Sequence, residues 1–310
     1  MTEQEGAKIS KLAERLELKN FTESIDLAEH FVTLADVNRP ALQLNGFYDH
    51  FEAGRIQLIG MVEWSYLMTK RSDEKRAGMF EKLLSYDVPC VIFCRGFEPQ
   101  EYMLKAAIER NIPLLGTERG TSEFMAELIY TLGYELAPTT TIHGVLVDVY
   151  GEGLLITGES GIGKSEAALE LIRRGHRLVA DDVVEIRKVN GDTLVGTSPE
   201  VTKHLIELRG IGIIDVKSLY GVECVEDRHT IGFVIKLEDW KRDTEYDRFG
   251  LEDEYMEILG SQVVCHSLPI RPGRNLAVIC ETAAVNYRQK KMGYNAAQEL
   301  YRRVQENMMR

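Results

Sequence analysis

The sequence feature that most constrains this chain is a phosphate-binding pattern, Gly-x4-Gly-Lys-Ser, at residues 158–165. A short apolar run at 154–157 precedes it, which is typical of a buried strand. After it, residues 164–174 carry apolar side chains at helical spacing, and Gly175 follows as a stop signal. The pattern therefore lies between an expected strand and an expected helix, which is the context that a phosphate loop requires.

The residue types in this loop indicate what it binds. Glycines allow backbone N–H groups to converge on phosphate oxygens, and the helix N-terminus adds partial positive charge. We therefore expect Lys164 to reach the terminal phosphates and Ser165 to contact a magnesium ion. The residues expected to bind nucleotide are Gly158, Glu159, Ser160, Gly161, Ile162, Gly163, Lys164 and Ser165.

Length and charge narrow the remaining possibilities. A chain of 310 residues argues for two domains or one large one, and the pattern of strands and helices predicts an α/β fold in both halves. The formal net charge of −12 disfavours a general nucleic-acid binder, because phosphate backbones require clustered Lys and Arg. No membrane-spanning run and no secretory signal pattern are evident, and five scattered cysteines favour a reducing cytoplasm.

Residues 1–136 are expected to form the first domain, a small α/β module. Strands are predicted at 42–44, 56–60, 88–93 and 112–115, with helices between them and a further helix capped by Ser122. No catalytic constellation is visible there. Isolated polar residues with expected surface roles are Arg39, His50, Arg95 and Arg119.

Residues 137–310 are expected to form the second domain, which contains the phosphate loop. A strand at 142–150 leads through the turn at 151–153 into the strand before the loop, so a β-hairpin precedes the loop. Asn190-Gly191 predicts another hairpin turn. Asn275 is expected to cap a helix that reaches residue 291, and Asn295 a final amphipathic helix.

Two adjacent carboxylates, Asp181 and Asp182, follow an apolar strand about 20 residues after the loop. Successive strand residues point to opposite faces, so one carboxylate is suited to magnesium and the other to a substrate hydroxyl. Either aspartate is a candidate proton acceptor, and the sequence does not rank them.

Three further segments carry charged residues of interest. Glu207 and Arg209 lie within an apolar, glycine-rich stretch, so each requires a partner or a metal. The basic loop Pro269-Ile270-Arg271-Pro272-Gly273-Arg274 could grip an anion. Arg248 lies in a highly charged segment, 241–257, that is expected to be exposed.

Together these blocks resemble the bifunctional HPr kinase/phosphorylases of Gram-positive and related bacteria. The resemblance rests on five blocks in this order, at 143–147, 158–165, 180–182, 206–215 and 269–275. The N-terminal half fits that family only in length and in α/β character.

The resemblance implies a fold and an activity. The catalytic domain of the family has a phosphate-loop core like that of phosphoenolpyruvate carboxykinase and assembles as a homohexamer. The family uses ATP or pyrophosphate to phosphorylate a regulatory serine of the phosphocarrier protein HPr, and in some bacteria of the related carrier Crh. It removes that phosphate with inorganic phosphate, releasing pyrophosphate, and so governs carbon catabolite repression and the sugar phosphotransferase system.

The resemblance also implies roles for individual residues. Ser165 and Glu207 would hold Mg2+, and Lys164 would neutralise the transferring phosphoryl group. Asp182 would accept the serine proton and return it in the reverse reaction, with Asp181 as the other candidate. His143 and Arg248 match the remaining catalytic positions, although His143 alone would be read as a surface or capping residue. Block 206–215 belongs to both reactions, and loop 269–274 chiefly to dephosphorylation.

Two other functions are compatible with a phosphate loop. One is a small-molecule kinase or carboxykinase-like enzyme, and the other is a scaffold that binds ATP without turnover. The acid pair and the basic loop favour chemistry over the scaffold.

Overall fold

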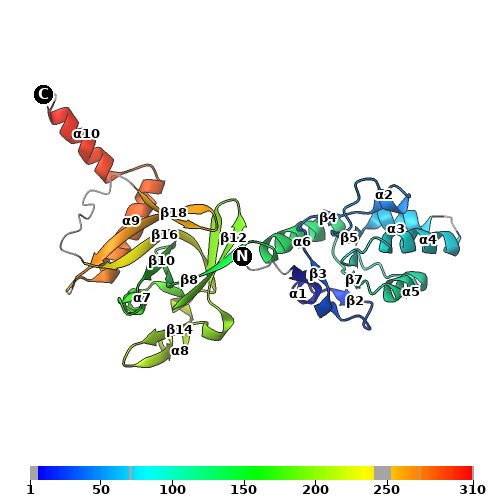
Figure 1. Cartoon of the computed structure of the whole chain (residues 1–310), viewed down its shortest axis with the longest axis horizontal. Coiled ribbons are helices and arrows are strands. Elements are labelled where there is room, and N and C mark those ends of the chain that lie inside the picture. Colours follow the sequence, from blue (N-terminus) through cyan, green and yellow to red (C-terminus); the bar gives the residue numbers. More distant parts are fainter. Residues whose placement is uncertain (1–5, 70–71, 241–252, 272, 309–310) are drawn as a thin grey trace. The chain divides into compact units, whose positions relative to one another are not determined.

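The computed structural model describes residues 6–69, 72–240, 253–271 and 273–308, and it divides the chain into two compact units. The first unit spans Met1–Ala137 and the second Pro138–Arg310 (Figure 1). Both combine helices with sheets, which confirms the expected α/β class. None of the described helices combines the length and the apolar character needed to cross a bilayer.

The first unit is built on a largely parallel sheet with the strand order β2-β7-β6-β5-β4. Its parallel strands are β4 (Val37–Asn38), β5 (Ile56–Ile59), β6 (Val91–Phe93) and β7 (Leu114–Gly116), with β2 (Lys19–Asn20) antiparallel at one edge. A separate pair joins β1 (Ala7–Lys8) to β3 (Phe31–Val32).

Helices cover both faces of this sheet. One face packs against α1 (Ile9–Arg15) and α6 (Thr121–Glu135), and the other against α2 (Ala41–Leu44), α3 (Met61–Met68), α4 (Asp73–Leu84) and α5 (Glu101–Glu109). The strand alternation explains this division, because Ile92 faces the first group while Val91 and Phe93 face the second. Both faces are buried, as a parallel sheet requires.

Two expectations for this unit were wrong. Residues 42–44 form part of α2 rather than a strand, because Pro40 opens a short helical turn whose exposed Leu42 cannot join the sheet. Helix α6 begins after Gly120, without a side-chain cap, and Ser122 lies inside it.

The second unit contains a branched sheet of nine strands among the described residues. Its main path runs β11-β9-β10-β16-β13-β12-β8, and β18 joins β16 and β17. The bounds are β8 (Thr139–His143), β9 (Val145–Val149), β10 (Glu152–Gly158), β11 (Arg177–Ala180), β12 (Val183–Asn190), β13 (Thr193–Thr197), β16 (Arg228–Asp239), β17 (Glu254–Ile258) and β18 (Ser261–Ile270). The expected hairpins before the phosphate loop and at Asn190-Gly191 are confirmed by the antiparallel pairing of β9 with β10 and of β12 with β13. The single strand expected at 142–150 is wrong, because the chain breaks at Gly144 into β8, which pairs with β12, and β9, which pairs with β10 and β11.

Helices α7 (Lys164–Arg173) and α9 (Leu276–Lys291) pack together on one face of this sheet. Its other face is covered by the sheet's own strands, around Leu146, Leu155 and Val234. A small hairpin of β14 (Leu205–Leu208) and β15 (Gly212–Asp215) leads to α8 (Val216–Tyr220). The final helix, α10 (Ala296–Met308), has no buried residue. Asn275 and Asn295 cap α9 and α10 as predicted.

The five cysteines are all free. Cys90, Cys94, Cys265 and Cys280 are buried, as is common for free cysteines, which pack like small apolar side chains.

Candidate active site

The phosphate loop lies where β10 ends and α7 begins, as the sequence predicted. Gly158 and Gly161 have φ values of 141° and 84°, a region that glycine alone adopts readily. A Cβ atom on Gly158 would lie 2.6 Å from the carbonyl oxygen of Leu237 on β16, so the close strand approach also requires glycine. The loop backbone is thereby held open above the helix N-terminus, where a phosphate chain can bind.

Lys164 closes the loop on itself. Its Nζ donates hydrogen bonds to the carbonyl oxygens of Gly158 and Glu159, at 3.0 and 2.9 Å. These contacts keep the ammonium group at the mouth of the loop, from which it can exchange carbonyl oxygens for phosphate oxygens.

Asp181 is buried beside the loop, with 3% of its surface exposed. Its Oδ1 accepts a hydrogen bond from Ser165 Oγ at 2.8 Å, and its Oδ2 accepts one from the backbone N–H of Glu207 at 3.1 Å. Burial raises the pKa of Asp181, and the charge of Asp182 raises it further, while the bond from Ser165 acts in the opposite direction. Asp181 therefore positions Ser165 and the β14 strand that carries Glu207.

Asp182 occupies a different environment from its neighbour. It has φ of 65°, a left-handed conformation that turns its side chain out of the strand, where it is 73% exposed. Its Oδ1 lies 4.0 Å from His143 Nδ1, and its carbonyl accepts a hydrogen bond from Gly144 N at 3.0 Å. The pairing of β8 with β12 sets Val183 opposite His143 and so brings these two side chains together. The Asp182 carboxylate is therefore accessible to a large substrate.

Arg209 lies against the phosphate loop. The sequence indicated that its charge requires a partner, but it predicted no individual role for this residue at the site. Its Nη2 donates a hydrogen bond to Ser160 Oγ at 3.1 Å, and its guanidinium lies where a Cβ atom on Gly161 would be. The signal that points to it is its position in an apolar stretch, since a charge there requires a partner. Arg209 places a second cation against the phosphate loop.

These groups surround one small pocket of about 110 Å³. Its lining includes loop residues together with Asp181, Asp182, Glu207 and Arg209. Ser165 Oγ and the carboxylates of Asp181 and Glu207 are hard oxygen donors of the kind that Mg2+ prefers, so the residues present fit this ion.

The basic loop approaches the same edge of the sheet. Strands β10, β16 and β18 run parallel, and their register aligns Gly158 with Leu237 and Leu237 with Leu268. The carboxyl ends of all three strands therefore meet at one edge, where α/β sheets bind ligands. At the start of α9, Leu276 Cδ1 lies 3.8 Å from the Cβ position of Gly163, which ties the end of the basic loop to the phosphate loop.

Within the basic loop, the two arginines differ in their contacts. The Arg271 guanidinium lies 3.6 Å from the centroid of the Trp240 ring, whereas Arg274 Nη1 donates to the carbonyl of Pro269 at 3.0 Å. Pro272 and Arg248, two of the residues predicted for the site, lie outside the described residues.

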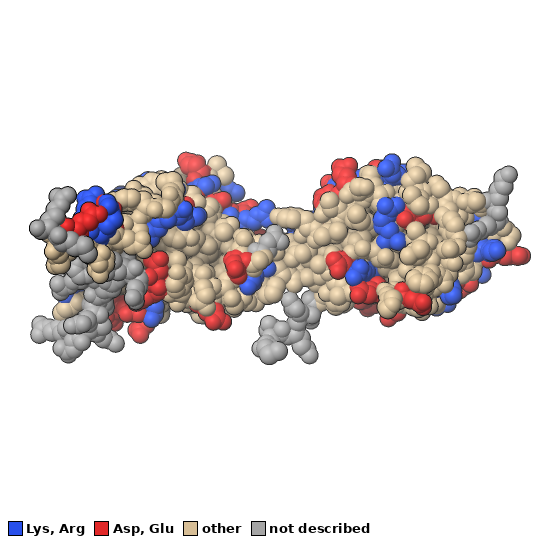
Figure 2. All heavy atoms as spheres, turned by 90° about the horizontal axis from the view of Figure 1, so that it is seen from above, with Lys and Arg blue, Asp and Glu red and all other residues tan. Residues whose placement is uncertain are grey.

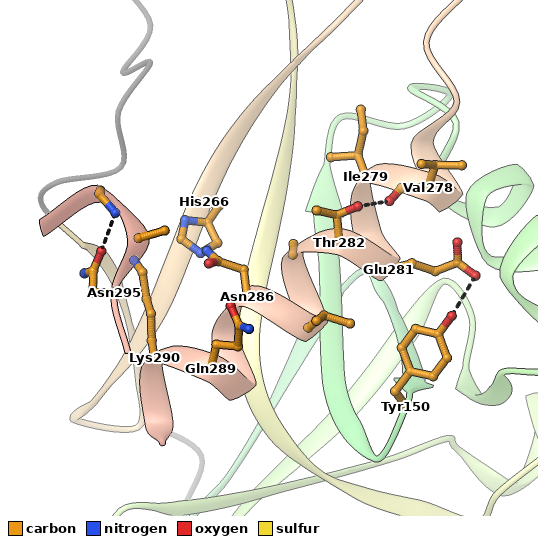
Figure 3. A pocket seen from close by; sticks show the side chains of 14 residues that line it. Tyr150, His266, Val278, Ile279, Glu281, Thr282, Asn286, Gln289, Lys290 and Asn295 are labelled. Atoms are coloured by element: carbon orange, nitrogen blue, oxygen red, sulfur yellow. Dashed lines mark hydrogen bonds between the residues drawn. The ribbon is translucent and has the colours of Figure 1, made fainter. Parts of the chain in front are cut away.

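A larger cavity of about 840 Å³ lies along α9 and the start of α10 (Figure 3). Figure 3 shows Tyr150 pointing toward Glu281, with Tyr150 Oη 3.5 Å from Glu281 Oε1, and His266 is another of the lining residues. Neither the phosphate loop nor the acid pair lines it. Although this cavity is larger than the pocket at the phosphate loop, its lining has none of the residues expected for phosphoryl transfer, so we do not assign the reaction to it.

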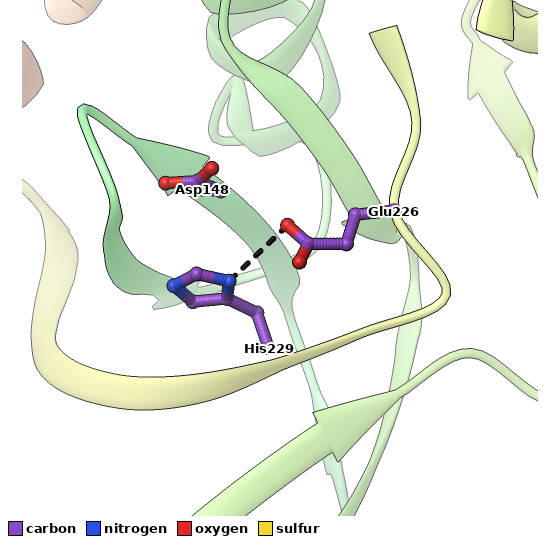
Figure 4. Close-up of side chains that lie close together, drawn as sticks. All are labelled: Asp148, Glu226 and His229. Carbon is purple, nitrogen blue, oxygen red and sulfur yellow. Dashed lines mark hydrogen bonds and ion pairs between the residues drawn. The ribbon is translucent and has the colours of Figure 1, made fainter. Parts of the chain in front are cut away.

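A cluster of Asp148, Glu226 and His229 has the composition of a metal site (Figure 4). However, Arg177 donates two hydrogen bonds to Asp148 Oδ2, at 2.9 and 2.6 Å, and lies 3.5 Å from Glu226. The arginine supplies the positive charge that a metal would supply, so this cluster is a structural ion-pair network.

The surface charges show no single-signed region on the face drawn in Figure 2, where Lys and Arg are interspersed with Asp and Glu. On this face the described residues form no continuous basic region.

Comparison with known proteins identifies relatives for both units. Residues 134–304 match the HPr Serine kinase C-terminal domain, and residues 7–132 match the HPr Serine kinase N terminus. The chain is 62% identical over 302 residues to the HPr kinase/phosphorylase of Lachnoclostridium phytofermentans, with 97% of each chain covered. It is 51% identical over 302 residues to that of Caldicellulosiruptor bescii, again with 97% of each covered.

Among solved structures, the Hpr(Ser) kinase/phosphatase from Coxiella burnetii is 39% identical, with a TM-score of 0.46. The match covers 52% of this chain and 98% of that chain. Family models match both units, and the relatives are similar over nearly the whole chain, in agreement with the five sequence blocks. This chain therefore belongs to the HPr kinase/phosphorylase family.

Proposed function

We propose that this chain transfers a phosphoryl group from ATP or pyrophosphate to a serine of HPr and removes it by phosphorolysis. The observation that carries the proposal is the division between two adjacent carboxylates, one buried against the phosphate loop and one exposed. A protein serine can reach only the exposed carboxylate. The names of the full-length relatives support HPr as the substrate, and the related carrier Crh is a further candidate.

In the forward direction, the loop and Lys164 would hold the phosphate chain, and Asp182 would take the proton from the serine hydroxyl. Ser165 and Glu207, with Asp181 behind them, would hold Mg2+, which neutralises phosphate oxygens when bound. His143, 4.0 Å from Asp182, would orient that carboxylate or the incoming hydroxyl. The serine oxygen forms a new bond to the transferred phosphorus while the bond from that phosphorus to its leaving group breaks, which releases ADP from ATP or inorganic phosphate from pyrophosphate.

In the reverse direction, an oxygen of inorganic phosphate attacks the phosphoserine phosphorus. The serine oxygen leaves, takes the proton from Asp182, and the product is pyrophosphate. This reaction needs a second anion site beside the loop. Arg271 and Arg274, at the carboxyl end of β18, would supply it, and Arg248 is proposed for the same site from the sequence alone.

The family resemblance further implies a homohexamer, which the exposed apolar side chains of α10 support. Leu300, Tyr301, Val304 and Met308 are all exposed, so a partner surface would bury them. We place the protein in the cytoplasm, as a regulator of sugar uptake and carbon catabolite repression.

One assay tests this function. Purified chain is incubated with Mg-ATP and HPr, and excess inorganic phosphate is then added. The expected result is acid-stable phosphoserine on HPr that disappears with release of pyrophosphate. Absence of labelled HPr under every condition would contradict the proposal. Turnover with a small acceptor alone would instead support a small-molecule kinase, and nucleotide binding without turnover a scaffold.

A further inference from the structure

The N-terminal unit contains a pocket of about 300 Å³ that is unrelated to the phosphate loop. It lies among α2, α3 and α4, and all of its lining residues fall between Gln43 and Lys82. Its volume is at the lower end of the range for small-molecule sites, which is about 300–1,000 Å³.

A chain of hydrogen-bonded amides orients Gln43, the first polar group of this pocket. Gln57, which is fully buried, donates from Nε2 to the carbonyl of Arg55 at 2.6 Å, so its Oε1 is left to accept from Asn38 Nδ2 at 2.7 Å. The same Asn38 nitrogen lies 3.5 Å from Gln43 Oε1. The Gln43 oxygen therefore faces Asn38, and its NH2 group remains to donate elsewhere.

The side-chain amide of Asn45 is also held in one orientation. Asn45 Oδ1 accepts a hydrogen bond from Tyr66 Oη at 2.6 Å. This contact fixes the orientation of the amide, and both donor positions of the Asn45 NH2 group are left for a ligand. Both amides that line the pocket thus have NH2 donors that no protein group engages among the described residues.

The charged residues of the pocket point to the same ligand chemistry. Lys75 and Lys82 lie seven residues apart on α4, so both lie on one face, about 10 Å apart along the helix axis. Within the described part of the chain, neither forms an ion pair, and no carboxylate lines the pocket. Lys82 Nζ is 4.9 Å from the centroid of the Tyr48 ring, which stacks on Tyr86 at 4.4 Å.

We propose that this pocket binds a small organic anion that carries a phosphate or carboxylate group. Two ammonium groups and two amide NH2 groups would contact the anionic group, while Leu44 and Met79 would pack against its carbon skeleton. A lining with two lysines and no carboxylate among the described residues is unexpected in a chain with a net charge of −12 unless an anion occupies it.

Lysine acetylation of the full chain, read by peptide mass spectrometry, tests the proposal site by site. The probes are inorganic phosphate, a sugar monophosphate and a dicarboxylate, at constant ionic strength. We expect at least one probe to slow acetylation of Lys75 and Lys82 roughly fivefold when four-fifths of the sites are filled. Lys105, an exposed lysine of α5, is the control and should keep its rate. The probe that slows acetylation of Lys75 and Lys82 most at equal concentration identifies the preferred anion, a phosphate or a carboxylate.

Calorimetry with variants separates this site from the phosphate loop. In a Lys164→Ala background, the preferred probe should still bind, and Lys75→Gln with Lys82→Gln should abolish binding while Lys105→Gln does not. Gln43→Leu keeps the approximate size but removes the donor, and should weaken binding severalfold. The proposal is overturned if no probe protects Lys75 and Lys82, if Lys105 is protected equally, or if binding disappears with Lys164→Ala alone.

Discussion

Ser165 donates a hydrogen bond to Asp181 across 2.8 Å, and this contact separates the environments of two adjacent aspartates. It draws Asp181 inward to the phosphate loop, while the left-handed backbone at Asp182 turns the next carboxylate out toward His143. The pair thus offers one carboxylate to the loop and another to an incoming substrate. The sequence left both aspartates as candidate proton acceptors, and their exposure now favours Asp182.

Asp182→Asn is expected to retain nucleotide binding and to lose both reactions, with rates reduced roughly 100- to 10,000-fold, as for removal of a general base. Asparagine tolerates the left-handed backbone at this position, so the fold should persist. Rates with HPr in both directions and nucleotide titration check this. Asp87→Asn is a matched control, because Asp87 is exposed with φ of 56° in the N-terminal unit. Near-normal turnover of Asp182→Asn would show that another group accepts the proton.

Local signals account for the parts of the site that the sequence predicted. The glycine spacing, the apolar run before it and the helix after it fix the phosphate loop within about twenty residues. The turn at Asn190-Gly191 and the caps at Asn275 and Asn295 likewise depend on neighbouring residues only.

Contacts between distant segments were not predictable in the same way. Arg209 reaches Ser160 across 49 positions of sequence, and no local pattern specifies that approach. The short segment 42–44 was assigned to a strand because two leucines flanking a glutamine fit a strand as well as a helix. The pocket beside α4 depends on amides from three separate elements, so residues that look unremarkable in sequence become a set only after folding.

Gly161→Ala is expected to weaken nucleotide binding by more than about tenfold, since the methyl group would displace the Arg209 guanidinium and strain a backbone with φ of 84°. Arg209→Ala should also weaken binding, because a cation beside the phosphates is lost. In the double variant the steric overlap is absent, so the combined loss should be smaller than the sum. Calorimetric titration of nucleotide measures all three, and strictly additive losses would argue against contact between the two residues.

His266 is expected to make the fold sensitive to acid. Burial lowers the pKa of His266, and the charge of Lys290 lowers it further, against the opposing effect of Asp253 and Glu254. As the pH falls, the unfolded chain therefore binds this proton at a higher pH than the folded chain does. The free energy of unfolding consequently decreases as the pH drops from about 6.5 through the lowered pKa. His266→Gln should flatten the dependence of melting temperature on pH in that window. An unchanged slope would mean that other groups dominate it.

Leu300→Glu with Val304→Glu is expected to shift the protein to smaller assemblies. The two residues lie four positions apart on one face of α10 and are 53% and 42% exposed, and a partner subunit would bury them. Light scattering during size-exclusion chromatography measures the mass. Gln298→Glu, which adds charge to an exposed position of the same helix, is the control. An unchanged mass would show that α10 does not hold the assembly together.

Arg271→Ala is expected to slow phosphorolysis by more than about tenfold relative to its effect on the kinase reaction, a difference of about 1.4 kcal/mol. Only the reverse reaction uses inorganic phosphate as a substrate, and the Arg271 guanidinium, held 3.6 Å from the Trp240 ring, is an exposed cation at that edge. Arg271→Lys should recover part of the loss through its charge but not the stacking. Arg274→Ala is a useful comparison, because Arg274 is bonded to the loop backbone. Equal losses in both directions for Arg271→Ala would assign the residue to holding the loop rather than to gripping phosphate.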